Sequence, residues 1–227
     1  MILNLTDKLK KGLIVSCQAD EGDPFNDVES LVKFAKAAYM GGAAAIRSEG
    51  IIKTQAIIEN VNLPVIGLVK SKFEDGTVKI TGAENQVSDL MKIGVHIIAV
   101  DGTFRKREGL TGPDFIKMLK TKFNCVILAD IASLEEGIAC VLAGADFVSS
   151  TLNGYTPETF DDNDGEPNFE LVKDLLKNVN VPVFAEGRIW NPQQAKKMLD
   201  MGAHSVIVGT AITRPRNITE SFIKALK

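Results

Sequence analysis

Short, almost continuously apolar runs rich in β-branched residues recur about every 27 residues along this chain. Eight such runs predict strands: Leu13–Ser16, Ala44–Arg47, Val65–Lys70, Val95–Asp101, Cys125–Asp130, Asp146–Thr151, Val183–Glu186 and Ser205–Gly209. Continuous rather than alternating apolar runs are typical of parallel strands that helices cover on the outside. The pattern therefore predicts an α/β fold, a (βα)8 TIM barrel in a single domain over residues 1–227 with a short N-terminal helix.

Helix signals stand between these runs. Asp23-Pro24 precedes apolar residues at helical spacing, from Val28 to Ala35. Ser133 with Glu136 forms a capping box, and Asn191-Pro192 supplies an N-cap followed by a proline at the first helical position. These signals place helices before the second, sixth and eighth strands.

A glycine turn is reused before every second strand. It reads Met40-Gly41-Gly42-Ala43, Ile93-Gly94-Val95, Ala143-Gly144-Ala145 and Met201-Gly202-Ala203. Glycine there ends a helix in the left-handed conformation and lets the chain turn tightly into a strand. A doubly wound sheet is the rival architecture, but no G-x-G-x-x-G follows the first strand, which counts against its dinucleotide-binding version.

One longer segment occurs twice, 118 residues apart, as Asn60-Val-Asn-Leu-Pro-Val65 and Asn178-Val-Asn-Val-Pro-Val183. The copies predict two related halves, with the third and seventh strands on opposite sides of the ring. The chemistry after the shared proline differs, since Lys70 aligns with Arg188 and Glu186 aligns with Leu68. The scaffold is duplicated, whereas the reactive groups are not.

Charged and polar residues gather where the predicted strands end, and reacting groups of such barrels lie at the carboxyl ends of the strands. The residues there are Ser16, Gln18, Arg47, Lys70, Asp101, Asp130, Thr151, Glu186, Arg188, Gly209 and Thr210. The two histidines, His96 and His204, fall at strand starts on the opposite face, so we expect them to be structural.

Lys70 and Glu186 stand six and four residues after the shared proline, so the strand period of two directs them to the same side of their strands. We expect them to reach into the barrel mouth from opposite walls with room for a small molecule between them. The alternative is an ion pair that helps to close the barrel, but a buried pair is costly unless well satisfied. Crowding by Arg47 would lower the lysine pKa towards the range that acid and base catalysis requires.

The end of the last strand predicts an anion site. Gly209 lets the backbone approach a ligand, Thr210 opens a short helix, and Arg214 adds a positive charge. Gly187 follows the seventh strand, and barrels of this type commonly hold phosphate after strands seven and eight. Plain glycine turns explain each glycine separately, but not their joint placement.

Composition excludes several classes of protein. The chain is 45% hydrophobic and 24% charged with a net charge of −3, which indicates an ordinary globular protein and not a nucleic-acid partner. No apolar run approaches the roughly 18 residues of a membrane span. The first residues are too charged for a signal peptide, and the three cysteines form no C-x-x-C pair. These features predict reduced thiols in a cytoplasmic protein without membrane partners.

The acidic stretch 161–165 does not fit a calcium loop, because an EF-hand with Gly165 in sixth place needs a ligand at Phe160 and a glutamate at Leu171. We expect no metal site here. We instead expect a solvated loop that, with Tyr155 and Thr156, covers the site.

Seven segments carry a family resemblance. They are Gly12–Gln18, Ala45–Gly50, Pro64–Lys70, Val100–Thr103, Thr151–Thr156, Ala185–Arg188 and Ala211–Pro215. In this order they closely resemble the N-acetylmannosamine-6-phosphate 2-epimerases. The resemblance implies an isomerase that interconverts N-acetylmannosamine 6-phosphate and N-acetylglucosamine 6-phosphate in sialic acid catabolism, without metal or organic cofactor.

Roles for the candidate residues follow from that reaction, in which the C2 proton leaves the open-chain aldehyde. Lys70 is the expected base, and Glu186 delivers a proton on the opposite face or assists ring opening. The expected substrate-binding residues are Gln18, Arg47, Asp130, Thr151 and Arg188, and the expected phosphate-binding residues are Gly187, Gly209, Thr210 and Arg214. Asp130 orients either Lys70 or a hydroxyl group.

Two other functions remain open. One is a phosphosugar barrel enzyme such as a Schiff-base aldolase that uses Lys70, and the other is a phosphosugar-binding regulator without catalysis. The expected partner is a small phosphosugar in each case. A homodimer is one assembly that the sequence leaves open.

Overall fold

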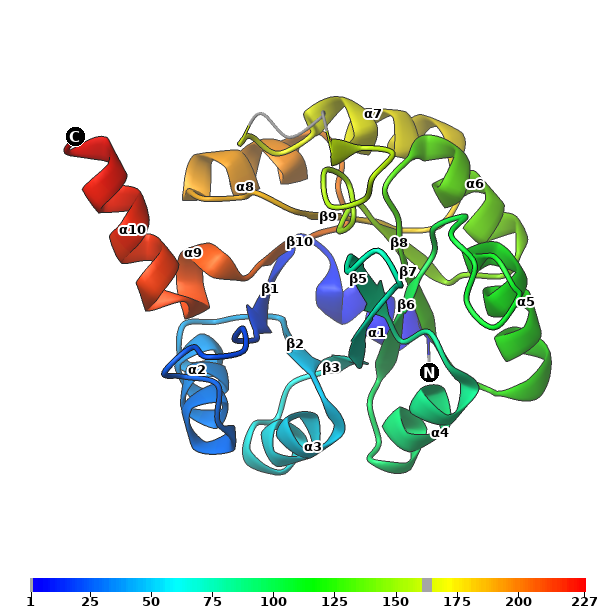
Figure 1. The fold of residues 1–227 in the computed structure, drawn as a ribbon, viewed down its shortest axis with the longest axis horizontal. Helices are drawn as coiled ribbons and strands as arrows, with labels where there is room; N and C mark the ends of the chain where they lie inside the picture. Colours follow the sequence, from blue (N-terminus) through cyan, green and yellow to red (C-terminus); the bar gives the residue numbers. More distant parts are fainter. Residues whose placement is uncertain (1, 161–164) are drawn as a thin grey trace.

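Eight parallel strands close into a barrel in the computed structural model, which describes residues 2–160 and 165–227 (Figure 1). Around the ring the order is β1-β10-β9-β8-β7-β6-β3-β2. The strands are β1 Gly12–Cys17, β2 Ala45–Glu49, β3 Val65–Leu68, β6 Ile97–Asp101, β7 Ile127–Asp130, β8 Phe147–Ser149, β9 Val183–Glu186 and β10 Ser205–Val208. The predicted TIM barrel is confirmed.

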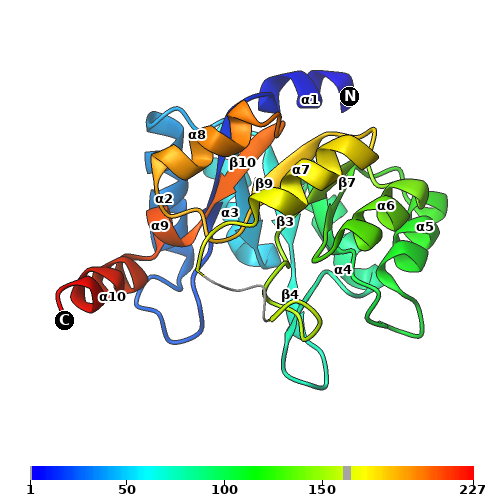
Figure 2. The ribbon, with the colours of Figure 1, turned by 90° about the horizontal axis from the view of Figure 1, so that it is seen from above.

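Helices cover the outside of the ring. They are α2 Val28–Met40, α3 Ile51–Asn60, α4 Glu84–Lys92, α5 Gly112–Lys122, α6 Leu134–Leu142, α7 Phe169–Asn178 and α8 Pro192–Asp200, followed by α9 Thr210–Thr213 and α10 Pro215–Ala225. The predicted N-terminal helix, α1 Ile2–Leu9, closes the amino end of the barrel (Figure 2). Its Leu5 and Leu9 are buried against the barrel interior with Ile14, Phe147 and Phe184.

The duplicated segment behaves as predicted. Its two copies follow α3 and α7 and lead into β3 and β9, which are four strands apart in either direction around the ring. The reused glycine turns are also confirmed, because Gly42, Gly94, Gly144 and Gly202 all have positive φ angles, between 82° and 113°. The repeated glycine turn therefore gives the backbone the same left-handed conformation before each of these strands.

Several element boundaries differ from the prediction by a few residues, among them the start of one helix and the end of the third strand. The helix after Asp23-Pro24 begins only at Val28, because the Asp27 side chain accepts a hydrogen bond from the Ser30 amide and caps it. The third strand ends at Leu68 instead of Lys70. The chain leaves the barrel there and forms an antiparallel ribbon of β4 Lys70–Lys72 and β5 Val78–Ile80.

The ribbon has a local sequence signal. Asp75-Gly76 lies between its strands, Gly76 has a φ of 83°, and the Phe73 amide donates to the Thr77 carbonyl. The Phe73–Thr77 hydrogen bond leaves residues 74–76 as the loop. A three-residue loop with a left-handed glycine is a common hairpin connection. The ribbon projects from the carboxyl end of the barrel, opposite α1 (Figure 2).

The last helix is unlike the others. Each of α2 to α8 buries side chains, whereas α10 buries none and projects from the body (Figure 1). None of the helices in the described residues combines the length and apolar character that crossing a bilayer requires. The acidic stretch 161–164, expected to cover the site, lies outside the described residues.

Candidate active site

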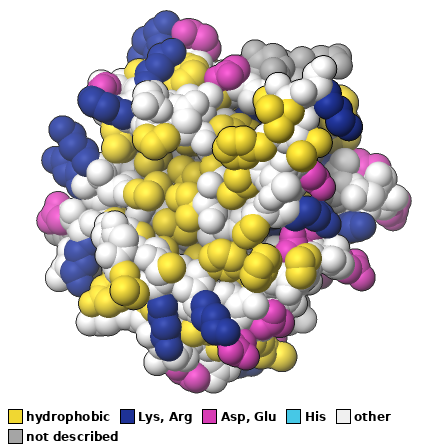
Figure 3. All heavy atoms as spheres, turned by 90° about the vertical axis from the view of Figure 1, so that its left-hand side faces the viewer, with side chains coloured by type: hydrophobic (Ala, Val, Ile, Leu, Met, Phe, Trp, Pro, Cys, Tyr) yellow, Lys and Arg dark blue, Asp and Glu magenta, His cyan; other side chains and the backbone are white. Residues whose placement is uncertain are grey.

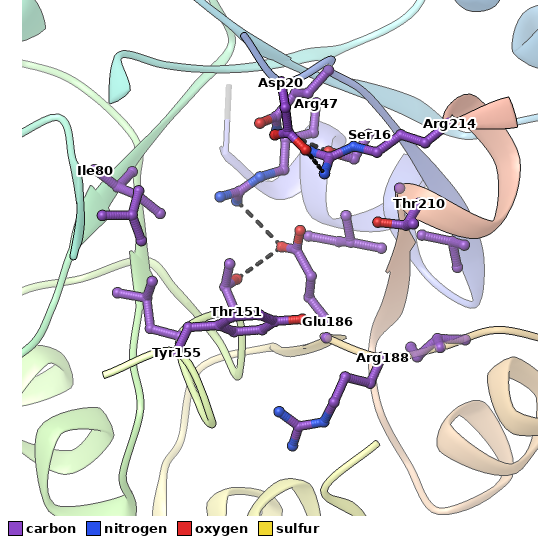
Figure 4. A pocket seen from close by; sticks show the side chains of 18 of the residues that line it. Ser16, Asp20, Arg47, Ile80, Thr151, Tyr155, Glu186, Arg188, Thr210 and Arg214 are labelled. Carbon is purple, nitrogen blue, oxygen red and sulfur yellow. Dashed lines mark hydrogen bonds and ion pairs between the residues drawn. The ribbon is translucent and has the colours of Figure 1, made fainter. Parts of the chain in front are cut away.

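A cavity of about 350 Å³ opens at the carboxyl ends of the strands (Figure 4). Its size suits a small organic ligand. Ten of the eleven predicted site residues line it: Gln18, Arg47, Lys70, Thr151, Glu186, Gly187, Arg188, Gly209, Thr210 and Arg214. Asp130, the eleventh, lies directly behind Arg47. The predicted residues, chosen because they follow the carboxyl ends of strands, therefore lie together in the structure.

Arg47 and two carboxylates form the buried centre of the site. The Arg47 guanidinium donates to both oxygens of Asp130, at 3.1 and 2.6 Å, and lies 3.4 Å from Glu186 Oε2. Burial disfavours the arginine charge, but Asp130 and Glu186 together raise the pKa of Arg47 above its usual range. Arg47 is thus a fixed cation at the cavity floor.

Thr151 joins the same group, just beyond β8. Its hydroxyl lies 2.7 Å from Asp130 Oδ1. The same hydroxyl lies 2.8 Å from Glu186 Oε2 (Figure 4). One hydroxyl proton serves only one of these carboxylates at a time. Desolvation and the neighbouring Asp130 raise the pKa of Glu186, against the attraction of Arg47. A carboxyl group with a raised pKa is suited to giving and taking a proton.

Lys70 lines the same cavity from the base of the ribbon. Its side chain is exposed within the mouth, yet protein surrounds it closely enough that desolvation, and then repulsion by Arg214, lower its pKa. Among the ion pairs of the described residues, none joins Lys70 to Glu186; Glu186 pairs with Arg47 instead. The ion-pair alternative for Lys70 is therefore wrong.

The residues predicted to bind phosphate lie along one side of the cavity. Gly187 has a φ of 104°, which glycine adopts without strain. A Cβ at Gly209 would come within 3.2 Å of the Ser16 side chain. Arg214, the residue between α9 and α10, points to this side and is held by Asp20 at 2.7 Å (Figure 4). On this side of the cavity a ligand can therefore approach the backbone at the two glycines and meet the positive charge of Arg214.

Gln18 and Arg188 are held differently. The buried Gln18 amide donates to Ser16 Oγ at 2.8 Å. Arg188 has a left-handed φ of 55°, and its guanidinium donates to the carbonyls of Asn153 and Glu166 at 2.9 and 2.7 Å. Figure 4 shows this guanidinium directed away from the Arg47–Glu186 pair. Substrate binding by Arg188 stays a prediction.

Other polar residues serve the scaffold. His96 Nδ1 accepts from the Val65 amide, and His204 Nε2 contacts the Thr6 carbonyl, both at the amino end of the barrel. Their predicted position at the starts of strands, away from the cavity, is confirmed. Asp101, at the end of β6, pairs with the buried Arg107 at 2.9 Å and does not line the cavity. The described residues contain no cluster of three or more acidic, histidine or cysteine side chains arranged for a metal ion.

Several cavity residues were not predicted from the sequence. They are Asp20, Val78, Ile80, Leu152, Ile189 and Trp190, with Ile207 and Val208 from β10. Ser16, predicted at a strand end, and Tyr155, expected over the site, also line the cavity. Val78 and Ile80 come from the ribbon, which Asp75-Gly76 between two alternating segments could have revealed. Asp20, Leu152, Ile189 and Trp190 lie in loops, where residue type alone carries no placement signal.

Comparisons with known proteins agree with this geometry. The family model described as "Putative N-acetylmannosamine-6-phosphate epimerase" matches residues 31–227. The chain belongs to this epimerase family. A family member from Caldanaerobacter subterraneus, named as a putative N-acetylmannosamine-6-phosphate 2-epimerase, is 44% identical over all of this chain and 96% of its own length. One of the same name from Mycoplasma mycoides is 40% identical over 99% of this chain and 100% of its own.

Solved structures support both family and fold. The N-acetylmannosamine-6-phosphate 2-epimerase from Clostridium perfringens superimposes with a TM-score of 0.90 at 41% identity, covering 97% of this chain and 96% of that one. A thiamine phosphate pyrophosphorylase from Pyrococcus furiosus superimposes with a TM-score of 0.64 at 17% identity, which is a likeness of fold alone. The similarity to the epimerase family therefore extends over the whole barrel of this chain.

Proposed function

We propose that this protein is an isomerase that interconverts N-acetylmannosamine 6-phosphate and N-acetylglucosamine 6-phosphate. One observation carries the proposal: Lys70, with a lowered pKa, and Glu186, with a raised one, line one cavity in a chain of the epimerase family. Pairs of groups with pKa values shifted towards neutrality are typical of acid and base catalysis. The reaction belongs to sialic acid catabolism.

The chemistry requires a proton to leave C2 and return on the other face. The proton on C2 is acidic only while C1 is an open-chain aldehyde. Loss of this proton leaves an enolate, whose oxygen needs a positive charge nearby. In our proposal neutral Lys70 takes the C2 proton. Glu186 supplies a proton on the opposite face or assists ring opening, and the buried Arg47 cation stabilises the enolate.

The remaining residues bind the substrate in this proposal. Gln18, Asp130, Thr151 and Arg188 hold the polar groups of the sugar, with Asp130 acting through Arg47 and the Thr151 hydroxyl. Gly187, Gly209, Thr210 and Arg214 hold the phosphate. Binding at the phosphate places the reacting carbon between Lys70 and Glu186. All steps use side chains of this chain alone.

A deuterium experiment tests the reaction. Purified protein is incubated with N-acetylmannosamine 6-phosphate in deuterated water and followed by proton NMR. We expect N-acetylglucosamine 6-phosphate to form with deuterium at C2. Neither epimer nor deuterium at C2 would contradict the proposal. Borohydride trapping of substrate on Lys70 would indicate a Schiff-base aldolase, and binding without any exchange would indicate a regulator.

Arg214→Ala tests the phosphate wall. Loss of this cation should raise KM for the phosphosugar by about 10- to 100-fold, because a charge-assisted hydrogen bond contributes about 1.5–3 kcal/mol. kcat at a pH where Lys70 is neutral should change much less, since Arg214 acts on the proton transfer only by lowering the pKa of Lys70. Arg216→Ala, an exposed arginine two residues on, is the matched control and should leave both constants unchanged. Equal KM values for the two variants would remove Arg214 from the phosphate site.

We also propose that the protein is a homodimer joined through α10. The helix exposes Phe222 at 68% and Ile223 at 49%, its C-cap Leu226 is 82% exposed, and none of its residues is fully buried. Figure 3 shows hydrophobic side chains gathered on the face from which α10 projects. An unpartnered apolar helix face of this kind indicates a protein interface, and a second copy is the partner present at the same concentration.

Light scattering after gel filtration tests the dimer. The wild-type mass should be twice the 24.6 kDa of one chain. Phe222→Asp should give the monomer mass, because it places a charge in the apolar contact. Lys224→Asp, on the opposite side of the same helix, should remain dimeric. A monomeric wild-type protein would contradict the proposal.

We also propose that the protein is located in the cytoplasm. Cys17 and Cys140 are buried free thiols, and none of the three cysteines is paired. Reduced thiols and a phosphosugar substrate both suit the cytoplasm. Cell fractionation with detection of this chain is the direct test.

A further inference from the structure

Lys70 is not carried by a barrel strand. It is the first residue of the β4–β5 ribbon, and its cross-strand partner is Ile80. The ribbon is fastened at its base by Thr81, whose amide donates to the Val69 carbonyl at 2.7 Å and whose hydroxyl accepts from the Val69 amide at 3.1 Å. Ile80 is also buried in the barrel core beside Lys70. A two-stranded ribbon alone is marginally stable, so its outer end needs an attachment of its own.

Arg105, from the loop after β6, holds that outer end. Its guanidinium donates to the Thr77 hydroxyl and, at 3.2 Å, to the Val78 carbonyl. It also lies 4.1 Å above the centre of the Phe73 ring. Three residues of the ribbon are thus bound by one side chain, and a planar guanidinium suits such combined stacking and hydrogen bonding.

Arg105 is itself fixed to the barrel. Its Nε donates to Thr103 Oγ1 at 3.4 Å, and its Nη2 lies 3.7 Å from the buried carboxylate of Asp101. The Thr103 hydroxyl in turn donates to Asp101 at 2.6 Å. The loop is anchored further where the Phe104 amide donates to Glu136 at 3.0 Å. The ribbon is therefore tied to the end of β6, a rigid part of the ring.

We propose that Arg105 is a positioning residue that fixes Lys70 through the β4–β5 ribbon. The inference rests on the proposed role of Lys70 as the base. Arg105 does not line the cavity, so it acts on the reaction only through the ribbon. Without it the ribbon keeps its base at Thr81 and Ile80 but loses the hydrogen bonds to Thr77 and Val78 at its outer end, so Lys70 is held less firmly at one distance from C2.

Steady-state kinetics of Arg105→Ala, Arg105→Lys and Lys106→Ala test this. Arg105→Ala should lower kcat by about 10- to 100-fold, because a misplacement of order 1 Å costs about 100-fold. KM should change by less than about threefold, since the phosphate wall is untouched. Arg105→Lys should recover part of kcat. Lys106→Ala removes an exposed positive charge from the same loop and should match wild type.

Thr77→Val examines the same contact from the ribbon. It removes the hydroxyl that Arg105 reaches while leaving the loop anchors in place. We expect a several-fold loss of kcat and no further loss when it is combined with Arg105→Ala, because both changes break one contact.

The outcomes separate this inference from the proposed function. If Lys70→Ala is inactive but Arg105→Ala keeps wild-type kcat, only the positioning role is overturned. Additive losses in the double variant, or a loss of kcat that merely follows the unfolded fraction in a melting curve, overturn it as well. If wild type catalyses no exchange at C2, the proposed function fails first.

Discussion

Lys70→Ala is expected to abolish deuterium exchange at C2 within detection, lowering kcat by about 10²- to 10⁴-fold, the usual contribution of a general base. Binding of the phosphosugar should stay within a few-fold, because Arg214 and the glycine backbone lie on another wall of the cavity. NMR measures the exchange, and calorimetric titration of the variant measures the binding.

Lys72→Ala is the matched control. Lys72 is an exposed lysine on the same ribbon strand, two residues along, so its loss leaves the proposed base intact. It should exchange at the wild-type rate. Equal rates for Lys70→Ala and wild type would remove Lys70 as the base.

The pH profile gives an independent check on Lys70. A lysine acts as a base only when neutral, so activity should rise with pH through the Lys70 pKa. Desolvation and Arg214 lower that pKa, and this rise should therefore occur below 10.5, the ordinary lysine value. A rise centred at or above 10.5 would contradict the lowered pKa.

Arg47→Met is expected to destabilise the fold more than other single substitutions at the site. Methionine keeps much of the volume but leaves Asp130 and Glu186 without their cation, and breaking a buried pair costs about 3–5 kcal/mol. For a domain of this size that corresponds to a fall in Tm of roughly 6–20 °C. Calorimetry measures it, and turnover should fall with loss of the enolate-stabilising charge.

An exposed ion pair of equal length is the control. Lys196 lies 2.6 Å from Asp200, as Arg47 does from Asp130, but the Lys196 and Asp200 side chains are 74% and 63% exposed instead of 2% and 0%. Lys196→Met should change stability by less than about 1 kcal/mol. Adding Asp130→Asn to Arg47→Met should restore part of the loss. Equal effects of the two methionine substitutions would contradict the burial argument.

Much of the site is predictable because it follows from strand ends. Arg47, Asp130 and Glu186 each end or nearly end an apolar run, and the barrel brings such ends to one face. Lys70 was placed in the cavity by counting along a strand that actually stops at Leu68. Lys70 still lies at the cavity because the ribbon begins at Lys70, two residues after β3 ends.

Other features were out of reach of local reasoning. The contact between Arg47 and Asp130 joins residues 83 apart in the chain, and that between Arg105 and Thr77 joins residues 28 apart. The sequence predicts Arg188 at the cavity, and only the fold shows that its guanidinium also donates to the carbonyls of Asn153 and Glu166. Which partner a long side chain selects depends on groups that arrive from other parts of the chain.

The hydrophobic pattern by itself determined the barrel, the order of its strands and the residues at their ends, because strand and helix periodicities are local and ring closure sends all strand ends one way. Tertiary structure alone decided that Arg47 rather than Lys70 pairs with Glu186, that Arg105 contacts the lysine ribbon, and that α10 projects from the body without a fully buried residue. These outcomes depend on distances and desolvation between segments remote in sequence, which exist only once the ring has closed.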